Sequence, residues 1–206
     1  MKDAKEFWDK SALKYAKSPI KDKNAYQKKL KITQDYFQSD CSVLEFGCGT
    51  GSTALLHSPF VKQMTATDIS DEMIEIAKQK AKNEGVKNIS FKQGTLDSLA
   101  LDKESFDVVL GLNILHLIKD LDGSVSKVYE LLKPGGVFVS STELIGEIIF
   151  FLRLIIPLMQ VLNLAPYVNV FNLQAYKSSL ARAGFTIEYE WQLNSHAVFL
   201  IAKKAG

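Results

Sequence analysis

The segment that most constrains this fold is residues 43–51, which read Val-Leu-Glu-Phe-Gly-Cys-Gly-Thr-Gly. A short apolar run that ends in a glycine-rich turn is typical of a buried parallel strand followed by a helix. Glycines at the end of such a strand let the backbone turn tightly and come close to a bound ligand. The segment therefore predicts an α/β protein that binds a ligand at the carboxyl end of its first strand.

The same alternation of strand and helix continues along the rest of the chain. Short apolar runs predict strands at 42–46, 61–67, 89–92, 106–110, 137–141, 185–191 and 196–202, and apolar residues at helical spacing predict helices at 71–83, 121–132 and 173–183. Strands that alternate with helices indicate a doubly wound, mostly parallel sheet with helices on both faces. The last two strands are too close together for a helical crossover, so we expect them to be antiparallel.

The register of the glycine loop and two acidic residues narrow the choice of ligand. In dinucleotide-binding proteins the loop reads G-x-G-x-x-G, whereas here the third glycine, Gly51, comes one residue early and Ser52 follows it. Glu45, two residues before Gly47, would repel a pyrophosphate and would suit a ligand that carries an ammonium group. Asp68, at the end of the second strand, is placed to accept hydrogen bonds from both hydroxyls of a ribose.

These residues resemble those of class I S-adenosylmethionine-dependent methyltransferases, and the resemblance runs from about residue 40 to the C-terminus. Residues 45–51 match the family's loop E/D-x-G-x-G-x-G at every fixed position, and Asp68 matches its ribose-binding acid. Residues 112–116 resemble the segment that closes over the methionine end of the cofactor, and residues 131–136 resemble the turn into the fifth strand. The resemblance implies S-adenosylmethionine as cofactor and a seven-stranded sheet of order 3-2-1-4-5-7-6 with strand 7 antiparallel.

The resemblance also implies a set of cofactor-binding residues. They are Tyr15, Glu45, Gly47, Cys48, Gly49, Gly51, Asp68, Ile69, Thr95, Leu96 and Asn113. Thr95 stands where the family usually has an aspartate that holds the adenine amino group, so we expect the backbone near Leu96 to recognise adenine. Residues 7–15 resemble the N-terminal lid of members that act on small molecules, in which a tyrosine contacts the cofactor; in the alternative interpretation Trp8 and Tyr15 only pack the lid helix. Cys48 is expected to be a small filler of the loop and not a nucleophile.

Methyl transfer from a sulfonium requires the nucleophile, the methyl group and the sulfur to be aligned, and it needs a base only where the nucleophile is protonated. His116 is the candidate base because it follows the fourth strand, on the side where the methyl group should emerge; alternatively its ring packs beneath a cap or caps a helix end. Glu143, at the end of the fifth strand, is a second polar group expected near the pocket. The three histidines show no metal-ligand spacing, so no metal is expected. His57 precedes an expected surface turn, and neither it nor His196 is assigned a role.

An apolar run at 144–164 is interrupted by Glu147, Arg153 and Pro157, which argues against a membrane span. By the resemblance it belongs to a cap insertion at 143–172, in a single domain that covers 1–206 and has a helical lid at 1–40. A cap this apolar predicts a small hydrophobic or amphiphilic acceptor, which the lysine-rich lid could help to reach at a membrane surface. Packing on the sheet and a dimer contact are the alternatives for this run.

Two other function classes fit the sequence less well. An NAD(P)-binding oxidoreductase is disfavoured by the loop register and by Glu45, whereas a non-catalytic S-adenosylmethionine-binding protein would keep the same loop. Nucleic acid is not expected as a partner, because the net charge is only +2 and no N-P-P-Y tetrapeptide follows the fourth strand. Two cysteines and a lysine-rich start without an apolar signal region favour the cytoplasm.

Overall fold

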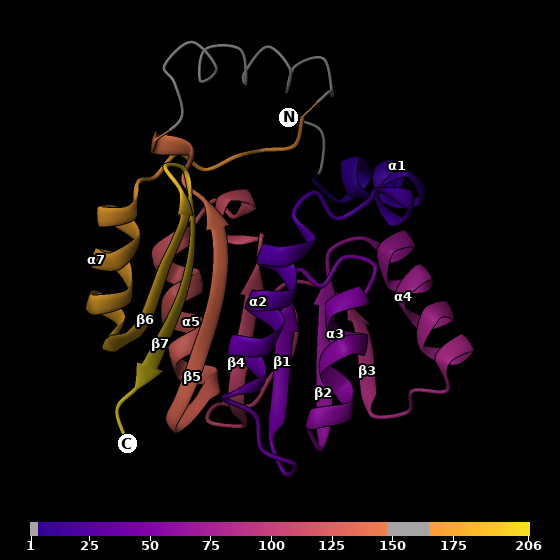
Figure 1. The fold of residues 1–206 in the computed structure, drawn as a ribbon, viewed down its shortest axis with the longest axis horizontal. Helices are drawn as coiled ribbons and strands as arrows, with labels where there is room; N and C mark the ends of the chain where they lie inside the picture. Colours follow the sequence, from indigo (N-terminus) through magenta and orange to yellow (C-terminus); the bar gives the residue numbers. More distant parts are fainter. Residues whose placement is uncertain (1–3, 148–164) are drawn as a thin grey trace.

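The computed structural model describes residues 4–147 and 165–206, which contain a seven-stranded sheet of order β3-β2-β1-β4-β5-β7-β6 (Figure 1). The strands are β1 (Ser42–Phe46), β2 (Gln63–Asp68), β3 (Ile89–Gln93), β4 (Phe106–Leu112), β5 (Leu132–Glu143), β6 (Phe185–Asn194) and β7 (Ala197–Lys204). Strands β1 to β5 pair in parallel, and β7 runs antiparallel to both β5 and β6. The predicted doubly wound fold, its strand order and the direction of the seventh strand are therefore confirmed.

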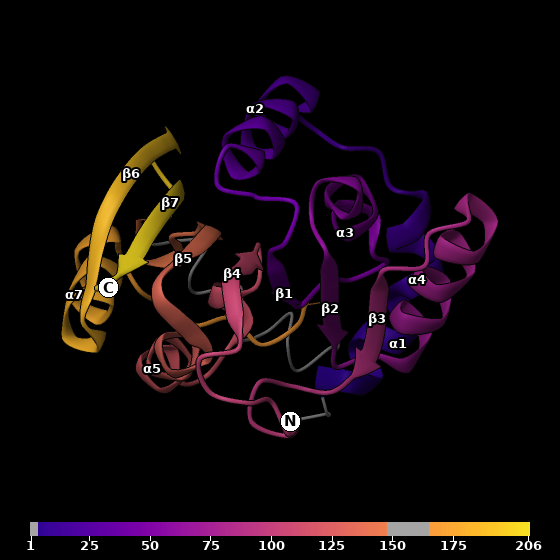
Figure 2. The ribbon, with the colours of Figure 1, turned by 90° about the horizontal axis from the view of Figure 1, so that it is seen from below.

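Helices cover both faces of this sheet. They are α1 (Ala4–Lys17), α2 (Lys23–Gln34), α3 (Ser52–His57), α4 (Asp71–Glu84), α5 (Leu121–Leu131) and α7 (Leu173–Ala183), with short 3₁₀ segments η1 (Ser58–Phe60), η2 (Leu115–Leu117) and η3 (Ile145–Glu147). Seen along the strands, α2 and α3 lie on one face of the sheet and α5 and α7 on the other (Figure 2). Helix α1 packs against α4 beside the β3 edge.

Two helices have end points close to the predicted ones, and polar capping residues and glycines set these end points. Helix α4 begins after Ser70, whose hydroxyl accepts a hydrogen bond from the backbone N–H of Met73 at 3.1 Å, and it ends at Gly85 in the left-handed conformation. Helix α7 is bounded in the same way, by Asn172 at its start and by the left-handed Gly184 at its end. These local signals explain why the predictions for 71–83 and 173–183 agree with the structure.

Alternate residues of the central strands enter two separate apolar layers. In β4, Val109 faces the layer formed with α5 and α7, while Val108 and Leu110 face the layer that contains residues of α3 and α4. In β1, Leu44 and Val43 divide between the same two layers. Both faces of β1 and β4 are therefore buried, as expected for parallel strands that read as continuous apolar runs.

The structure corrects the sequence-based expectations at two places. Strand β5 begins at Leu132, earlier than the predicted 137, so the turn at 133–136 lies inside the strand. The pairing with β4 changes register between Phe106 and Val108, which accommodates the residues of this turn. His57 precedes the exposed turn at Pro59 and Phe60, as predicted, but its own side chain does not lie at the surface. It is completely buried at the end of α3, where its ring meets that of Phe37 edge-on at a centroid distance of 5.0 Å. No local pattern indicates this packing, because Phe37 comes from an earlier segment of the chain.

The predicted cap insertion at 143–172 is described only at its two ends, because residues 148–164 lie outside the described residues. The N–H of Gly146 donates to the carbonyl of Phe171 at 2.9 Å, and Leu144 and Phe171 are both buried. The two ends of the segment therefore meet beside the end of β5. Within residues 4–147 and 165–206, no helix is both long enough and apolar enough to cross a membrane.

Candidate active site

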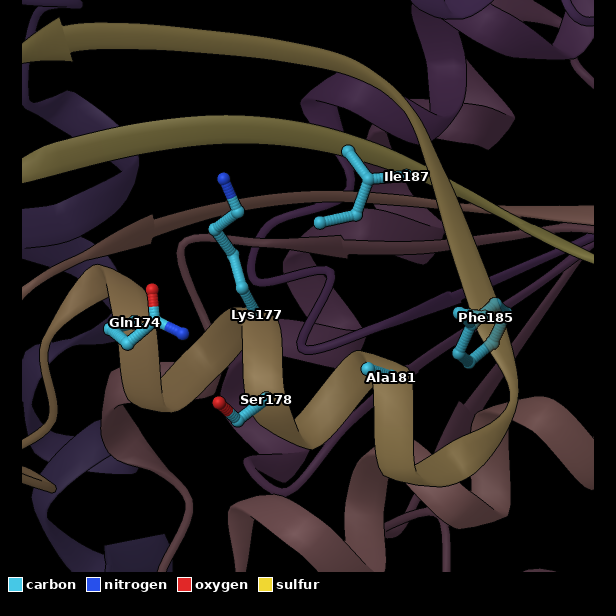
Figure 3. Close-up of a pocket in the computed structure, with 6 residues that line it drawn as sticks. All are labelled: Gln174, Lys177, Ser178, Ala181, Phe185 and Ile187. Carbon is cyan, nitrogen blue, oxygen red and sulfur yellow. The ribbon is translucent and has the colours of Figure 1, made fainter.

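One surface groove lies away from the residues that the sequence singles out. It has a volume of about 340 Å³ and lies between α7 and β6, lined by Gln174, Lys177, Ser178, Ala181, Phe185 and Ile187 (Figure 3). It is at the β6 edge of the sheet, whereas open α/β sheets bind their ligands at the carboxyl ends of the central strands. The candidate site therefore lies at the ends of β1, β2, β4 and β5.

The glycine loop after β1 depends on its glycines for packing as well as for backbone conformation. Gly47, Gly49 and Gly51 have φ values of 68°, 53° and 72°, a left-handed conformation that other residues rarely adopt. A Cβ at Gly47 would lie 2.5 Å from Cγ1 of Ile114, and a Cβ at Gly51 would lie 2.8 Å from Cβ of Ala77. Gly47 and Gly51 thus let neighbouring elements approach, whereas a Cβ at Gly49 would meet only the ring of Tyr15, at 3.5 Å.

Asp68, at the end of β2, holds this loop through its side chain. Its Oδ2 accepts a hydrogen bond from the N–H of Gly49 at 2.9 Å, and its Oδ1 accepts one from the N–H of Ser70 at 2.9 Å. The N–H of Cys48 also donates to the carbonyl of Thr67 at 2.9 Å. Burial raises the pKa of Asp68, and the two N–H donors oppose that effect. The loop and the end of β2 therefore form one connected unit.

Glu45 points into the same unit as a buried carboxyl. It is 2% exposed, and its Oε2 has no hydrogen-bond partner among the described residues. Burial, with a smaller contribution from the charge of Asp68, raises the pKa of Glu45 to about 8. Burial also raises the pKa of Cys48 well above its usual value, so its thiol stays protonated at neutral pH. A cationic ligand beside Glu45 would favour its ionised form.

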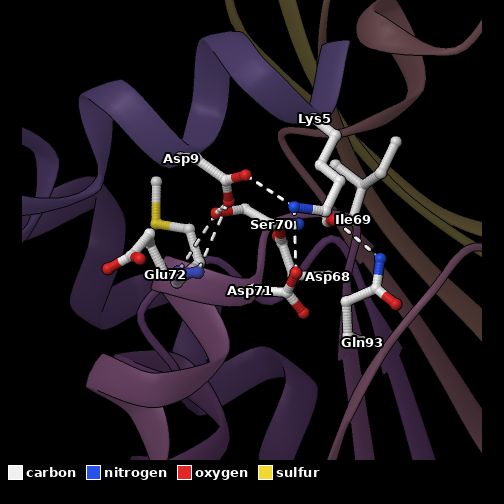
Figure 4. A network of polar contacts seen from close by, with 9 residues as sticks. Lys5, Asp9, Asp68, Ile69, Ser70, Asp71, Glu72 and Gln93 are labelled. Carbon is white, nitrogen blue, oxygen red and sulfur yellow. Dashed lines mark hydrogen bonds and ion pairs between the residues drawn. The ribbon is translucent and has the colours of Figure 1, made fainter. Parts of the chain in front are cut away.

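Helix α1 docks onto the residues that follow Asp68 through a network of charged and polar groups (Figure 4). Oδ1 of Asp9 accepts hydrogen bonds from the hydroxyl of Ser70 at 2.6 Å and from the N–H of Glu72 at 3.4 Å. Lys5 bridges Asp9 at 2.6 Å and Asp71 at 2.9 Å. The predicted lid helix is thus joined to the start of α4, directly next to the predicted ribose-binding carboxylate.

The same helix places Tyr15 over the glycine loop. Cε1 of Tyr15 lies 3.5 Å from the position of a Cβ on Gly49, and its ring meets that of Trp8 edge-on at 6.2 Å. Tyr15 is 51% exposed, and partial desolvation together with the charges of Asp68 and Glu45 raises its pKa. Tyr15 therefore packs on Trp8, as one interpretation of the sequence holds, and also reaches the loop, as the other requires.

The segment after β3 lies beside Asp68. The N–H of Gly94 donates to the carbonyl of Asp68 at 2.9 Å, and the amide of Gln93 donates to the carbonyl of Ile69 at 3.0 Å (Figure 4). Thr95 is exposed and exchanges hydrogen bonds with Ser98, with its own N–H donating to the serine hydroxyl at 2.8 Å. Leu96 is 5% exposed and packs in the core, so only its backbone can face a ligand.

Asn113 lies at the end of β4, in a left-handed conformation with φ of 57°. Its N–H donates to the carbonyl of Ser141 at 2.7 Å, and its Oδ1 accepts from the hydroxyl of Ser141 at 3.3 Å. Lys29 of α2 donates to the same hydroxyl at 3.1 Å. Lys29 is not among the predicted site residues, because it lies in a lysine-rich helix; the sequence signal for it is its spacing from Leu30 and Thr33, which are buried on the same helix.

His116 lies in η2, just past β4, and is partly buried. Its Nδ1 is 3.3 Å from Oγ1 of Thr142, and which of the two atoms donates depends on which ring nitrogen carries the proton. Burial lowers the pKa of His116 to about 4, so the ring is neutral at pH 7. The N–H of Asn169 donates to the carbonyl of His116 at 2.7 Å, which joins the end of the cap segment to this turn.

The predicted residues thus fall into two groups along one edge of the sheet. One group surrounds the ends of β1 and β2 and consists of Tyr15, the glycine loop, Asp68, Ile69 and the backbone at 94–96. The other group follows β4 and consists of Asn113 and His116. His196 is exposed and His57 is packed away from this edge. In the parts of the chain that the structure describes, no group of three or more histidine, cysteine, aspartate or glutamate residues is placed to hold a metal ion.

The chain is similar to known methyltransferases over the segment that contains the glycine loop. Residues 43–136 match the family model described as a methyltransferase domain. An uncharacterized methyltransferase of Bacillus subtilis is 38% identical over 97 residues, which are 47% of this chain and 38% of that protein. Malonyl-[acyl-carrier protein] O-methyltransferase of Priestia megaterium is 32% identical over 120 residues, 57% of this chain and 42% of that protein.

A solved structure is similar over the whole chain. A phosphoethanolamine N-methyltransferase of Haemonchus contortus, in complex with phosphomonomethylethanolamine and S-adenosylhomocysteine, has a TM-score of 0.81 at 16% identity, and the match covers 100% of this chain and 61% of that one. At this identity the similarity shows the shared fold. The chain spans about two fifths of the length of the two curated relatives that it matches. The family match includes the glycine loop and Asp68, so the resemblance predicted from them is confirmed.

Proposed function

We propose that this chain, whose residues 43–136 form a class I S-adenosylmethionine-dependent methyltransferase domain, transfers a methyl group from S-adenosylmethionine to a small acceptor. The observation that carries the proposal is the arrangement of two carboxyl groups around the glycine loop. Asp68 holds the loop backbone, while Oε2 of the buried Glu45 has no partner within the described residues. A nucleoside that carries positive charge is the ligand that this pair of groups fits.

The cofactor, when bound, supplies a methyl group on a positively charged sulfur together with the leaving group. The residues present fit it. Asp68 has acceptor capacity for ribose hydroxyls beyond the two N–H groups that it already binds, and Gly49 leaves the loop backbone open. Glu45 would lose its proton when the positive charge of the cofactor comes near, because that charge offsets the burial that raises its pKa.

His116 is the group that we assign to proton removal from the acceptor. Burial lowers its pKa to about 4, so the ring is neutral at pH 7 and one of its nitrogens can accept a proton. The contact of its carbonyl with Asn169 supports the ring position from the far end of the cap segment. Catalysis would then rest mainly on holding the acceptor in line with the methyl group, with His116 taking a proton where the nucleophile carries one.

The nature of the acceptor and the surroundings of the site are part of the proposal. The buried residues Leu144 and Phe171, which meet at the ends of the apolar segment 143–172, support a cap beside the site and an acceptor with an apolar part. The names of the relatives, which include one that acts on a malonyl carrier protein, support a small or carrier-bound acceptor. Contact of the lysine-rich lid with a membrane surface, a dimer through the cap, and a cytoplasmic location remain predictions.

Calorimetry tests the cofactor assignment directly. We expect S-adenosylmethionine and S-adenosylhomocysteine to bind with a dissociation constant on the order of 10 μM, about −7 kcal/mol, and NAD not to bind. Binding of S-adenosylmethionine measured near pH 7 in two buffers of different ionisation enthalpy should show proton release, and Glu45→Gln should abolish that release. Binding of NAD in place of S-adenosylmethionine would overturn the proposal.

Transfer is tested separately with cofactor labelled on its methyl group. Polar and lipophilic acceptors are incubated with the full chain, and label in the product is counted. If the cofactor binds but no acceptor in a broad set is labelled, a non-catalytic role in cofactor binding becomes the better account.

A further inference from the structure

Lys29 of α2 reaches the end of β5. Helix α2 is held beside the sheet by Tyr26, whose hydroxyl lies 3.1 Å from Oγ1 of Thr53, and by Lys28, whose ammonium group lies 3.9 Å from the ring centroid of Trp191. Directly after these two anchors, Lys29 extends to the hydroxyl of Ser141 at 3.1 Å. Its ammonium group is thus positioned by a rigid element and not by a loop.

The charge of Lys29 is only partly compensated by the described residues. Lys29 is half-buried, its one hydrogen-bond partner there is a neutral hydroxyl, and it forms no ion pair with a described carboxylate. Burial lowers the pKa of Lys29, and the charges of Glu143 and Asp22 oppose this from beyond hydrogen-bond distance. An ammonium ion has three donors, so two remain for other acceptors.

Lys204 is a second lysine with a buried side chain, and its ammonium group is fully paired. It lies 3.3 Å from a carboxylate oxygen of Glu104 and donates to the carbonyls of Leu132 at 2.7 Å and Tyr129 at 3.0 Å. All three of its donors and its charge are therefore satisfied within the fold. Lys29 differs, because a partly desolvated cation with unused donors is stabilised when an anion binds beside it.

We propose that Lys29 is the anion-binding residue of the acceptor site, and that the acceptor carries an oxyanion, either a carboxylate or a phosphate. This inference rests on the proposed methyl transfer, and it names the class of substrate. Lys29 lies at the same strand ends as Asn113, to which the hydroxyl of Ser141 connects it. The acceptor would then have an apolar part and an anionic group, and the anionic group would bind at α2.

The alternation of β5 separates this charged end from the proposed base. Ser141 faces Lys29, and the next residue, Thr142, contacts His116. Because successive side chains of a strand point to opposite faces, Lys29 and His116 approach the end of β5 from opposite sides of the sheet. An acceptor with its oxyanion on Lys29 would extend across the strand ends, which places its nucleophile toward His116.

Binding of simple anions to the full chain saturated with S-adenosylhomocysteine tests this inference. The probes are benzoate and inorganic phosphate, which separate a carboxylate from a phosphate preference, and benzamide, the uncharged analogue of benzoate. Calorimetry or amide chemical shifts should show binding of at least one anion and no binding of benzamide. We expect Lys29→Met to weaken anion binding by about tenfold, the loss of one charge-assisted hydrogen bond, and Lys29→Arg to retain it.

The matched control is Lys31→Met, which removes an exposed lysine from the same helix and should leave anion binding unchanged. Equal binding by wild type and Lys29→Met overturns the inference, as does wild-type protein that binds neither anion or binds benzamide as well as benzoate. The wild-type comparison decides the matter even if Lys29→Met fails to fold. Failure of S-adenosylhomocysteine to bind at the outset would instead overturn the proposed function.

Discussion

The two ends of the candidate site are built in different ways. Around Asp68 the contacts are hydrogen bonds from backbone N–H groups, with Gly49 and Ser70 both at 2.9 Å from its carboxylate oxygens. At the ends of β4 and β5 the contacts join side chains from distant segments, such as Lys29 to Ser141 at 3.1 Å and His116 to Thr142 at 3.3 Å. The first end is held mainly by the backbone of two neighbouring loops, after β1 and after β2, and the second by side chains from distant segments.

This difference fits two separate tasks, binding of the cofactor at the first end and choice of the acceptor at the second. Backbone contacts around the glycine loop keep their geometry when neighbouring side chains change, so they suit a cofactor that is the same for every acceptor. Side-chain contacts from α2, β4 and β5 can be replaced one at a time, so they suit the choice of acceptor. Substitutions at the two ends should therefore differ in which measurement they change.

The largest expected effect is on stability, at the glycine loop. Gly51→Ala should lower the free energy of unfolding by about 3 kcal/mol, because it combines a left-handed backbone with a Cβ that would lie 2.8 Å from Cβ of Ala77. Gly85→Ala is the matched control: its φ of 69° is nearly the same, but no atom lies within 4 Å of the added Cβ, so a loss of about 1 kcal/mol is expected. Urea unfolding measures both variants, and equal losses would show that packing around the loop is unimportant.

The next effect is on cofactor affinity. Asp68→Ala should weaken S-adenosylmethionine binding about 100-fold, because it removes charge-assisted hydrogen bonds both to the ribose and to the loop. Asp68→Asn keeps one acceptor oxygen and should lose less. Calorimetry measures the affinities, and thermal unfolding verifies that each variant is folded. Unchanged affinity in Asp68→Ala would mean that the cofactor binds elsewhere.

Substitution of the two histidines with lowered pKa should affect turnover differently, because His116 lies at the acceptor end and His57 is buried at the end of α3. His116→Ala should reduce turnover about 30-fold while cofactor affinity stays unchanged, since loss of a general base removes a step of proton transfer. His57→Gln should leave turnover unchanged. Steady-state rates at saturating cofactor distinguish the two, and equal rates in wild type and His116→Ala would remove His116 from the mechanism.

His57 should instead determine part of the dependence of stability on pH. Burial lowers its pKa to about 4 in the folded protein, against about 6.5 in the unfolded chain, so acidification protonates the unfolded chain first. This contribution is fully present above pH 6.5 and is lost as the pH falls toward 4, by about 2 kcal/mol at pH 5. His57→Gln should flatten the profile in that range, and an unaltered profile would contradict the assignment.

The smallest effect is expected at the junction between the lid helix and the cofactor end. Asp9→Asn should weaken cofactor binding about fivefold, because it removes the charge that pairs with Lys5 and weakens the contact of α1 with Ser70. Lys10→Gln is the control, since Lys10 forms an exposed pair with Glu6 on the same helix. A response in Asp9→Asn no larger than in Lys10→Gln would show that the lid does not support the cofactor site.

The sequence by itself determined the fold and the cofactor end. Apolar periodicity, capping residues and the spacing of Glu45, Gly47 and Asp68 are local signals, and in a parallel sheet the end of each strand necessarily lies at the same edge. The antiparallel last strand could be predicted from the short connection before it, and the strand order was implied by the family resemblance. The interior turn of β5 and the burial of His57 could not, because both depend on partners far away in the chain.

Only the tertiary structure decided the acceptor end. The spacing of Leu30 and Thr33 shows which side of α2 is buried, but that Lys29 reaches Ser141 is decided only when α2 is placed against β5. The neutral state of the His116 ring likewise follows from its burial in the folded protein. Long-range side-chain contacts are set by how whole elements pack, and no spacing along one segment encodes them.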